Sequence, residues 1–369
     1  MKKLLHIQCL PKLSGVQNIS YEILKGLPSQ EYDKTIMFSA DGSEESKKNI
    51  IDAFKSIGVR VVFSSNLIRE LNFVKDIKAF FEIYRFCRKE KFDIVHTHSS
   101  KPGVVGRIAA TFAKVPYVVH TVHGLSFHKF VKFPKWQFYF LCEMFASLFC
   151  KKIVLVNKFY GKYFHLFKNK TSTIYNAVNY EKFAGIEQKQ NNDERINVLF
   201  VGRLDAQKNP LCLLRSARIV ISKNSSVHFT LVGDGEFYSE CKRFITENNL
   251  SDNIYLAGWQ KNPGIFYADA DVFAASSIYE AFGLMFVEAG YFSLPVCATN
   301  VEGVPEVVQE GVSGFLCEPN DDEALAENIL KFCNDKELRQ NMGKESYRIA
   351  TELFTINAMI QGYRKLYEE

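Results

Sequence analysis

Short apolar runs alternate with segments of helical length along almost the whole chain. The runs are rich in β-branched and aromatic residues, which is typical of buried strands. Such alternation predicts βαβ units, and therefore parallel sheets with helices on both faces. The expected strands are 3–9, 34–39, 59–63, 93–97, 117–121 and 153–156 in the first half, and 196–201, 227–232, 253–256, 272–275, 296–298 and 314–317 in the second. The expected helices are near 16–27, 44–57, 74–90, 103–114, 133–150, 209–223, 235–249, 262–269, 284–293, 321–334 and 336–351.

A polar stretch interrupts this alternation near the middle of the chain. Residues 185–195 contain few apolar side chains and end in a run of amides and charges, which is typical of an interdomain linker. A length of 369 residues also suits two domains better than one. We therefore expect an α/β protein with two doubly wound domains, 1–184 and 196–350. Residues 351–369 are expected to form a C-terminal helix that packs back toward the first domain.

The composition is that of an ordinary globular protein, with 47% hydrophobic and 24% charged residues. The nine cysteines form no C-x-x-C pair, which indicates reduced, buried thiols in a cytosolic protein. The start at Met1-Lys2-Lys3 imitates a signal peptide, but His6 and Gln8 break the apolar region too early. No apolar run is long enough to span a membrane.

The positive charge is concentrated in the first half of the chain. Residues 1–190 contain 30 Lys and Arg against 15 Asp and Glu, whereas residues 191–369 contain 16 against 26. Between residues 96 and 180, twelve basic residues stand against a single acid, Glu143. A domain this basic needs an anionic partner: nucleic acid, an anionic membrane surface or an anionic substrate. Nucleic acid is the least favoured, because the sequence has no arginine-rich or recognition-module motif.

The segment 129–152 is apolar on nearly every side and has lysines at both ends. It is too short to span a bilayer. One interpretation is a buried helix that covers the sheet. The other is an interfacial helix, with aromatic side chains in the headgroup layer and lysines on anionic lipid. The basic surroundings leave both interpretations open.

Two carboxylates stand eight positions apart, at Glu280 and Glu288. Between them, Ala281-Phe282-Gly283 resembles a turn and is followed by an apolar run from Leu284. A helix that begins near Gly283 would present free N–H groups and the positive end of its dipole, which suits a phosphate. The two acids would then hold different parts of one elongated ligand. The same spacing also fits a capped core helix with two solvated glutamates.

Three other loops follow predicted strands, where ligands bind in parallel α/β sheets. Arg203 and Lys208, after the strand 196–201, either clamp a diphosphate or remain solvated. Gly15 at a helix start allows close approach of a ligand to the backbone, although a single glycine is usually just a turn. His123 follows the strand 117–121, and a functional and a structural role are equally open.

His96 and His98 lie at the end of a predicted strand and face the same side of it. A zinc site requires a third ligand and commonly a nearby acid. The sequence places neither beside this pair, so we expect no metal site.

Several of these motifs occur in a fixed order along the chain. They are Thr121-Val122-His123-Gly124, Gly202-Arg203-Leu204 with Lys208, the Glu280–Glu288 pair, Pro295–Thr299, Gly303-Val304-Pro305-Glu306 and Gly314-Phe315-Leu316. Together they resemble the retaining glycosyltransferases of family four, whose GT-B architecture has two facing Rossmann-like domains. The resemblance covers nearly the whole chain, and the stretches His96–Gly106 and Val118–Phe127 are most similar to bacterial capsular-polysaccharide and O-antigen enzymes.

The resemblance implies a nucleotide-sugar donor held mainly by the second domain, and an acceptor bound by a first domain that faces the membrane. Arg203 and Lys208 would neutralise the diphosphate. Glu288 would bind the ribose hydroxyls, and Glu280 would orient the donor sugar near its reacting carbon. The implied catalytic residues are Glu280 and His123, which would contact the sugar, and the implied donor-binding residues are Gly15, Arg203, Lys208, Ala281, Phe282, Gly283, Leu284 and Glu288.

The implied reaction is hexosyl transfer from a UDP-sugar to a lipid-linked saccharide in surface polysaccharide biosynthesis, at the cytoplasmic face of the membrane. It would retain the anomeric configuration and use no metal or other cofactor, with the departing phosphate accepting the acceptor's proton. One alternative is a nucleotide-sugar epimerase of the same architecture, although residues 96–180 offer only Glu143 as a catalytic acid. The other is a non-catalytic nucleotide-sugar-binding subunit.

The sequence departs from the family pattern at two places. The family often has glycine where Ala281 stands, and a Gly-Gly pair where Ser14-Gly15 stands. A methyl group at Ala281 either crowds the donor sugar or narrows the choice of donor.

Overall fold

The computed structural model describes residues 1–128, 130–188 and 195–369. These residues form two compact units, Met1–Asn176 with Ile356–Glu369, and Ala177–Thr355. Lys129 and most of the expected linker lie outside the described residues. Each unit is built on a parallel sheet, so the predicted α/β class with two doubly wound domains is confirmed.

The described part of the first unit contains a sheet of seven parallel strands in the order β3-β2-β1-β4-β5-β6-β7. The chain runs from β1 outward to β3 and then returns to β4 on the other side of β1. The edge strand β7 was not predicted, because its three residues Thr-Ser-Thr have no apolar pattern. The strands are β1 (Lys2–Ile7), β2 (Tyr32–Ser39), β3 (Arg60–Ser64), β4 (Ile94–His98), β5 (Tyr117–Val122), β6 (Lys152–Leu155) and β7 (Thr171–Thr173).

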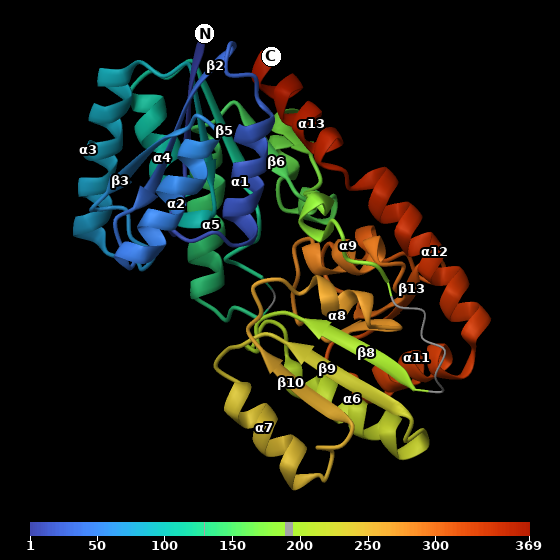
Figure 1. Cartoon of the computed structure of the whole chain (residues 1–369). Coiled ribbons are helices and arrows are strands. Elements are labelled where there is room, and N and C mark those ends of the chain that lie inside the picture. The colour runs from blue at the N-terminus through green and yellow to red at the C-terminus, as the bar shows by residue number, and fades with distance from the viewer. Residues whose placement is uncertain (129, 189–194) are drawn as a thin grey trace. The chain divides into compact units, whose positions relative to one another are not determined.

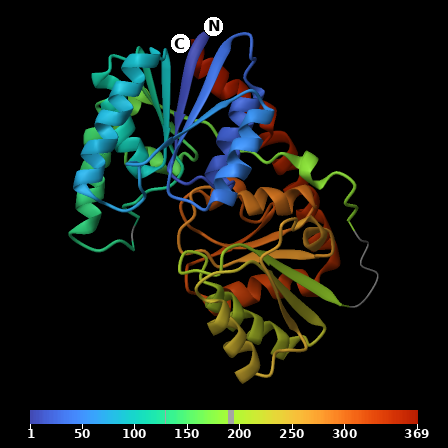
Figure 2. The same cartoon turned by 60° about the vertical axis from the view of Figure 1, so that its left-hand side comes forward.

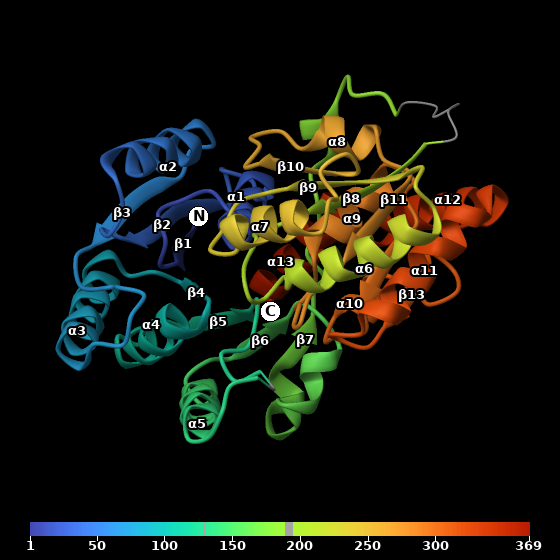
Figure 3. The same cartoon turned by 90° about the horizontal axis from the view of Figure 1, so that it is seen from below.

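Helices cover both faces of the first sheet. Figure 3 shows α1 and α2 on one side of the sheet, and α3, α4 and α5 on the other. The C-terminal helix α13 packs against α1 and so belongs to this unit. The helices are α1 (Gly15–Gly26), α2 (Glu44–Ser56), α3 (Phe73–Glu90), α4 (Ser100–Phe112), α5 (Lys135–Ser147) and α13 (Ile356–Glu368).

The second sheet has the same winding pattern, with the order β10-β9-β8-β11-β12-β13 among its described residues (Figures 1 and 2). Helix α6 packs with α7 and α11, and α9 packs with α12. The strands are β8 (Ile196–Val201), β9 (Val227–Val232), β10 (Ile254–Gly258), β11 (Val272–Ala275), β12 (Val296–Thr299) and β13 (Gly314–Cys317). The helices are α6 (Pro210–Lys223), α7 (Tyr238–Glu247), α8 (Gly264–Ala268), α9 (Leu284–Tyr291), α10 (Val304–Val307), α11 (Asp322–Asn334) and α12 (Lys336–Leu353).

Several helices begin at a residue whose side chain caps the N-terminus. Asn72 Oδ1 accepts a hydrogen bond from the Lys75 N–H at 3.0 Å at the start of α3, and Asp335 Oδ1 accepts one from the Leu338 N–H at 2.9 Å at the start of α12. Such a cap satisfies one of the N–H groups that a helix leaves free at its N-terminus. Helix α9 has no side-chain cap. Helices α4 and α6, among others, also begin without one.

The second unit begins earlier than the predicted boundary at residue 184, at Ala177. Tyr180 stacks on Tyr291 with ring centroids 4.3 Å apart, and its hydroxyl donates to the Ala350 carbonyl at 2.8 Å. Phe183 packs edge-on against Phe292 at 5.0 Å. These contacts attach the segment to the second unit, although it precedes the polar stretch.

Candidate functional site

The winding of the second sheet reverses between β8 and β11. Strands β9 and β10 follow on one side of β8, whereas β12 and β13 follow β11 on the other. At such a switch point the loops beyond the carboxyl ends of the two strands separate and leave a ligand site between them. The loop after β8 carries Arg203 and Lys208, and the loop after β11 carries Glu280.

Hydrogen bonds hold these two loops together. The Gln207 carbonyl accepts from the Ile278 N–H at 2.8 Å, and the Gln207 amide donates to the Tyr279 carbonyl at 3.1 Å. The Gly303 N–H donates to the Glu280 carbonyl at 3.1 Å and so connects the loop after β12 to the loop after β11. The backbone around Glu280 is therefore fixed from both sides.

Lys208 and Glu280 form an ion pair at this junction. Both residues are buried, and the ammonium also lies 3.4 Å from the sulfur of Met285. The structure thus brings together two residues that were predicted to act on different parts of a ligand. An ammonium has three donors, so Lys208 retains one for a phosphate beside its contacts with Glu280 and Met285.

Arg203 lies at the surface of the same loop. Its guanidinium contacts Asp205 at 2.7 Å and Gln207 at 2.9 Å, and two-thirds of its side chain is exposed. Because a guanidinium carries five N–H donors, these two contacts leave donors that point to solvent. Arg203 is accessible to an anion, whereas Lys208 is buried.

Helix α9 begins where the sequence predicted, at Leu284 directly after Gly283. Gly283 has a φ of 79°, and a Cβ there would lie 2.5 Å from the ring of Phe286, so this position requires glycine. The absence of a side-chain cap leaves first-turn N–H groups available to a ligand. Ala281 and Leu284 are partly exposed, but Phe282 is 2% exposed and its ring packs against Phe354. Only the backbone of Phe282 is therefore available for donor binding.

Glu288 lies on α9 and is held by two residues that sequence reasoning missed. Tyr267 donates a hydrogen bond to Oε2 at 2.9 Å, and Lys182 contacts Oε1 at 2.5 Å. Lys182 fell within the predicted first domain, so no pattern placed it beside Glu288. The two partners fix the carboxylate, which keeps an edge toward solvent because 13% of its side chain is exposed.

The first sheet reverses its winding between β1 and β4. Gly15 starts α1 after β1, and a Cβ there would meet nothing within 4 Å. His123 follows β5, the neighbour of β4. Both predicted residues of this unit therefore lie near the carboxyl ends of its central strands.

His123 is partly exposed, and its Nε2 lies 3.0 Å from Nδ1 of His98. Burial lowers the pKa of His123 to about 3, so the imidazole is neutral near neutral pH. A neutral imidazole has one N–H donor and one acceptor nitrogen. Nε2 of His123 is occupied by the hydrogen bond with His98. The direction of that bond determines whether the other ring nitrogen, Nδ1, carries the proton.

The expectation that no third metal ligand accompanies His96 and His98 was wrong. His6 on β1 is in register with His96 on β4, and ring nitrogens of the three buried residues lie within 4.8 Å of one another. His6 is distant in sequence and becomes their neighbour only through the order of the strands. Among the described residues, this is the group of titratable side chains best placed to hold a metal ion.

Comparisons with known proteins show the family to which the chain belongs. The family model for Glycosyltransferase Family 4 matches residues 13–182, and the model for Glycosyl transferases group 1 matches residues 182–349. The chain is 36% identical over 358 residues to the UDP-Gal:alpha-D-GlcNAc-diphosphoundecaprenol alpha-1,3-galactosyltransferase of Escherichia coli, covering 91% of this chain and 89% of the relative. It is 27% identical over 317 residues to the capsular polysaccharide biosynthesis glycosyltransferase CapM of Staphylococcus aureus, covering 81% and 82%.

Solved structures show the same fold. The Anabaena protein HepE in complex with UDP superimposes with a TM-score of 0.82 at 20% identity, covering the whole of both chains. The crystal structure of TarM gives a TM-score of 0.80 at 14% identity and covers 100% of this chain and 99% of TarM. The predicted GT-B fold class is thereby confirmed.

Proposed function

The chain belongs to glycosyltransferase family four, and we propose that it transfers a sugar from a UDP-sugar to a lipid-linked saccharide diphosphate in surface polysaccharide biosynthesis, with retention of configuration. The observation that carries this proposal is the Lys208–Glu280 pair at the switch point of the second sheet, next to the uncapped start of α9. The E. coli relative, whose name states a UDP-galactose donor and a diphosphoundecaprenol acceptor, supports the substrate classes.

In this proposal the second unit binds the donor. Arg203 and Lys208 neutralise the diphosphate, together with the N–H groups at the start of α9. Glu288 accepts hydrogen bonds from the ribose hydroxyls. Two cations and a helix N-terminus supply the positive charge that a divalent ion supplies in other transferases, so we propose that the reaction needs no metal.

The chemistry follows from the leaving group. The acceptor hydroxyl oxygen forms a bond to the anomeric carbon while the bond from that carbon to the diphosphate oxygen breaks. The departing diphosphate takes the acceptor's proton on the same face of the sugar, so configuration is retained without a protein nucleophile. Glu280, held by Lys208, orients the sugar, and His123 contacts it.

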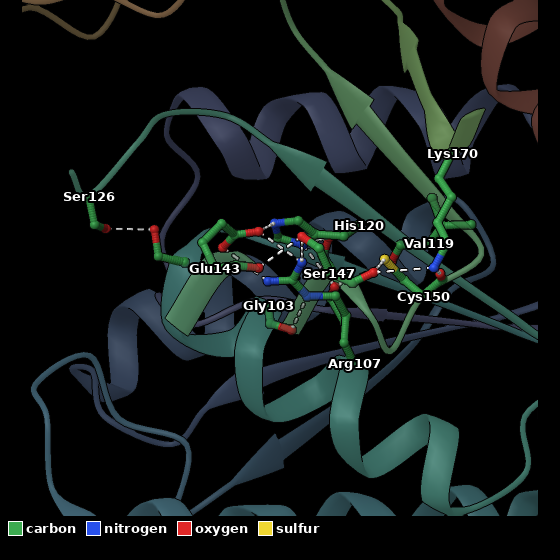
Figure 4. A network of polar contacts seen from close by, with 11 residues as sticks. Gly103, Arg107, Val119, His120, Ser126, Glu143, Ser147, Cys150 and Lys170 are labelled. Carbon is green, nitrogen blue, oxygen red and sulfur yellow. Dashed lines mark hydrogen bonds and ion pairs between the residues drawn. The ribbon is translucent and has the colours of Figure 1, made fainter. Parts of the chain in front are cut away.

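We propose further that the first unit docks on an anionic membrane at the cytoplasmic face, through α5. The inner side of this helix is fixed by Arg107 of α4, whose guanidinium binds both oxygens of Glu143 at 2.8 and 3.0 Å (Figure 4). Arg107 also donates to the Gly103 carbonyl at 2.8 Å and is fully buried. This contact explains how the single acid of the basic segment is accommodated, and it determines which side of α5 faces outward.

The outward side of α5 is apolar. Phe138, Leu141 and Phe145 recur at helical spacing, each more than half exposed, and Leu148 continues the row. Exposed Lys132 and Lys135 lie at one end of it, and exposed Lys151 lies at the other. An aromatic stripe bordered by lysines suits the headgroup layer of an anionic bilayer. Among the described residues, none of the helices combines the length and the hydropathy of a membrane-spanning segment.

A transfer assay tests the proposal. The purified protein is incubated with UDP-galactose or other UDP-hexoses and with N-acetylglucosamine diphosphoundecaprenol, in the presence and absence of EDTA. The expected result is a lipid-linked disaccharide with an α linkage, formed at the same rate with EDTA. An isomerised UDP-sugar without a disaccharide would indicate the epimerase instead. Binding of UDP-sugars without turnover would indicate a non-catalytic subunit.

A further inference from the structure

A continuous chain of hydrogen bonds crosses the core of the first unit and ends at His123. Its members come from β1, β4, β5 and the C-terminal helix α13, apart from His123, which directly follows β5; all except His123 are buried. None of them lies in the donor loops of the second unit. We call this set the histidine chain; in order of contact its members are Tyr363, Thr121, His96, Tyr367, His6, His98 and His123.

The half of the histidine chain nearest to His123 consists of imidazoles. His98 Nδ1 lies 3.0 Å from His123 Nε2, and His98 Nε2 lies 3.1 Å from His6 Nδ1. Ser20 Oγ also approaches His98 Nε2 at 3.3 Å. Both ring nitrogens of His98 are therefore engaged, and the ring links His6 to His123.

The other half is anchored by two tyrosines of α13. The Tyr367 hydroxyl lies 3.0 Å from His6 Nε2 and 2.5 Å from His96 Nδ1. His96 Nε2 lies 2.7 Å from Thr121 Oγ1, which lies 3.2 Å from the Tyr363 hydroxyl. Helix α13 thus supplies the only hydroxyl between His6 and His96 in this series of contacts.

The contacts have a direction. Each imidazole is neutral, because burial lowers the pKa of His6 and His123 to about 3 and lowers those of His96 and His98 as well. Each ring therefore has one donor and one acceptor. Among the described residues, the Tyr363 hydroxyl forms its hydrogen bond with Thr121, and Tyr363 is fully buried. A buried O–H without an acceptor is costly, so Tyr363 donates to Thr121.

This first donor determines all the others. Thr121 donates to His96 Nε2, so His96 carries its proton on Nδ1 and donates to Tyr367. Tyr367 then donates to His6, and His6 donates through Nδ1 to His98. His98 donates through Nδ1 to His123 Nε2. In the opposite direction the Tyr363 proton would have no acceptor among these groups.

We propose that the histidine chain holds His123 as the tautomer protonated on Nδ1, and that this N–H donates to a hydroxyl of the donor sugar. His98, His6 and Tyr367 are then positioning residues, which act through His123. The inference rests on the proposed function, in which His123 contacts the sugar. It adds a role for α13, whose tyrosine side chains act on the residue that directly follows β5.

A metal ion at His6, His96 and His98 is the competing explanation of the same cluster. The nitrogens that face one another are already paired with imidazole or hydroxyl groups. A metal ion would have to replace these hydrogen bonds. The hydrogen-bonded chain accounts for the neutral rings without a further component, so we favour it.

Nitrogen-15 NMR of the imidazole side chains tests the tautomer without reference to activity. His123→Gln identifies the signals of His123 by their loss. In the unaltered protein we expect one protonated nitrogen on His123, at Nδ1. Tyr367→Phe removes the hydroxyl that connects His96 to His6 and should give a mixture of the two tautomers. Tyr117→Phe is the matched control, because the Tyr117 hydroxyl is buried without a partner in the same unit.

Kinetics test the consequence for transfer. For Tyr367→Phe we expect kcat to fall about tenfold, the loss typical of one hydrogen bond, with little change in the Kd for UDP. His98→Leu should lose more activity, and His98→Asn should restore part of it, because the Asn amide still donates toward His123. Unchanged tautomer and unchanged kcat in Tyr367→Phe would overturn the proposal and leave the proposed function standing.

Two further results separate the explanations. A His123 proton on Nδ1 in a protein that transfers no sugar would support the histidine chain and reject the proposed function. Stoichiometric binding of zinc that raises the melting temperature of the unaltered protein more than that of His6→Asn would overturn the hydrogen-bonded chain in favour of the metal site.

Discussion

Lys208 and Glu280 form a buried ion pair that joins the loop after β8 to the loop after β11. Glu280→Gln keeps the size of the side chain and an acceptor for Lys208 but removes the charge. We expect kcat to fall about 10²-fold or more, as for the loss of one preorganised electrostatic contact, while the circular dichroism spectrum is unchanged. Glu247→Gln, at an exposed position on α7, is the control. Full transfer activity in Glu280→Gln would reject the site.

The same pair predicts that stability and activity can be separated. Lys208→Met leaves Glu280 buried without its partner and should cost about 3–5 kcal/mol of unfolding free energy. The double variant Lys208→Met/Glu280→Gln removes both charges and should regain most of this loss, because no buried charge remains unpaired. Transfer should stay abolished in both. Urea unfolding and the transfer assay together give the result; a double variant as unstable as Lys208→Met would contradict it.

The carboxylate of Glu288 depends on Tyr267 for its position. Tyr267→Phe removes a hydrogen bond to a charged group, whose loss costs about 1.5–3 kcal/mol. If Glu288 binds ribose, KM for the nucleotide sugar should rise about tenfold or more, with little effect on kcat. Tyr255→Phe, at an exposed tyrosine of β10, controls for the substitution. A loss of kcat at unchanged KM would place Glu288 in the chemical step instead.

The two-domain α/β fold was predictable because parallel strands buried on both faces are short and continuously apolar. The start of α9 was predictable for a similar local reason, since Gly283 stands between a turn and an apolar run. Strand β7 was not predictable, because it has no apolar pattern. The attachment of Tyr180 to the second unit was not predictable either, because it depends on a stacking partner, Tyr291, that is distant in sequence.

The candidate site was predicted by residue type but not by contact. Charge and loop position indicated Arg203, Lys208 and Glu280, yet nothing local indicated that Lys208 pairs with Glu280 across 72 positions. His6, Tyr363 and Tyr367 were missed for the same reason. They reach the strand ends of the first sheet only through strand order and the return of α13.

The neutral histidines predict a loss of stability in mild acid. Burial, reinforced by His123, lowers the pKa of His6 to about 3, and burial lowers that of His123 to about 3, below the usual 6.5. Between these values the unfolded chain binds protons that the folded chain does not, so stability is complete above pH 6.5 and falls as the pH decreases. Each such histidine contributes about 1.4 kcal/mol per pH unit.

Urea unfolding between pH 7.5 and about 5 measures this slope. His6→Asn should reduce the dependence of the unfolding free energy on pH by the contribution of one histidine. His165→Gln, at an exposed position, should leave it unchanged. A slope that is equal in all three proteins would show that the buried rings are not the source of the pH dependence.

The outward stripe of α5 predicts binding to anionic membranes. Each lysine near an anionic surface contributes about 1 kcal/mol, so Lys132→Glu/Lys135→Glu should weaken binding about 30-fold or more. Adding Lys129→Glu, at a position outside the described residues, should weaken it further. Phe138→Ser/Leu141→Ser/Phe145→Ser removes the apolar contact and should weaken binding without changing the net charge. Sedimentation with vesicles of phosphatidylglycerol and phosphatidylcholine in equal parts measures both effects.

A control variant and the dependence on salt distinguish the contribution of charge to membrane binding from that of apolar contact. Lys48→Glu/Lys55→Glu changes the net charge equally on α2, away from the stripe, and should bind almost as the unaltered protein does. Salt should weaken binding of the serine variant more than that of the lysine variant, because only the former retains the full electrostatic attraction. Equal losses for the α2 and α5 lysine pairs would mean that net charge alone attracts the protein and that α5 is not the docking surface.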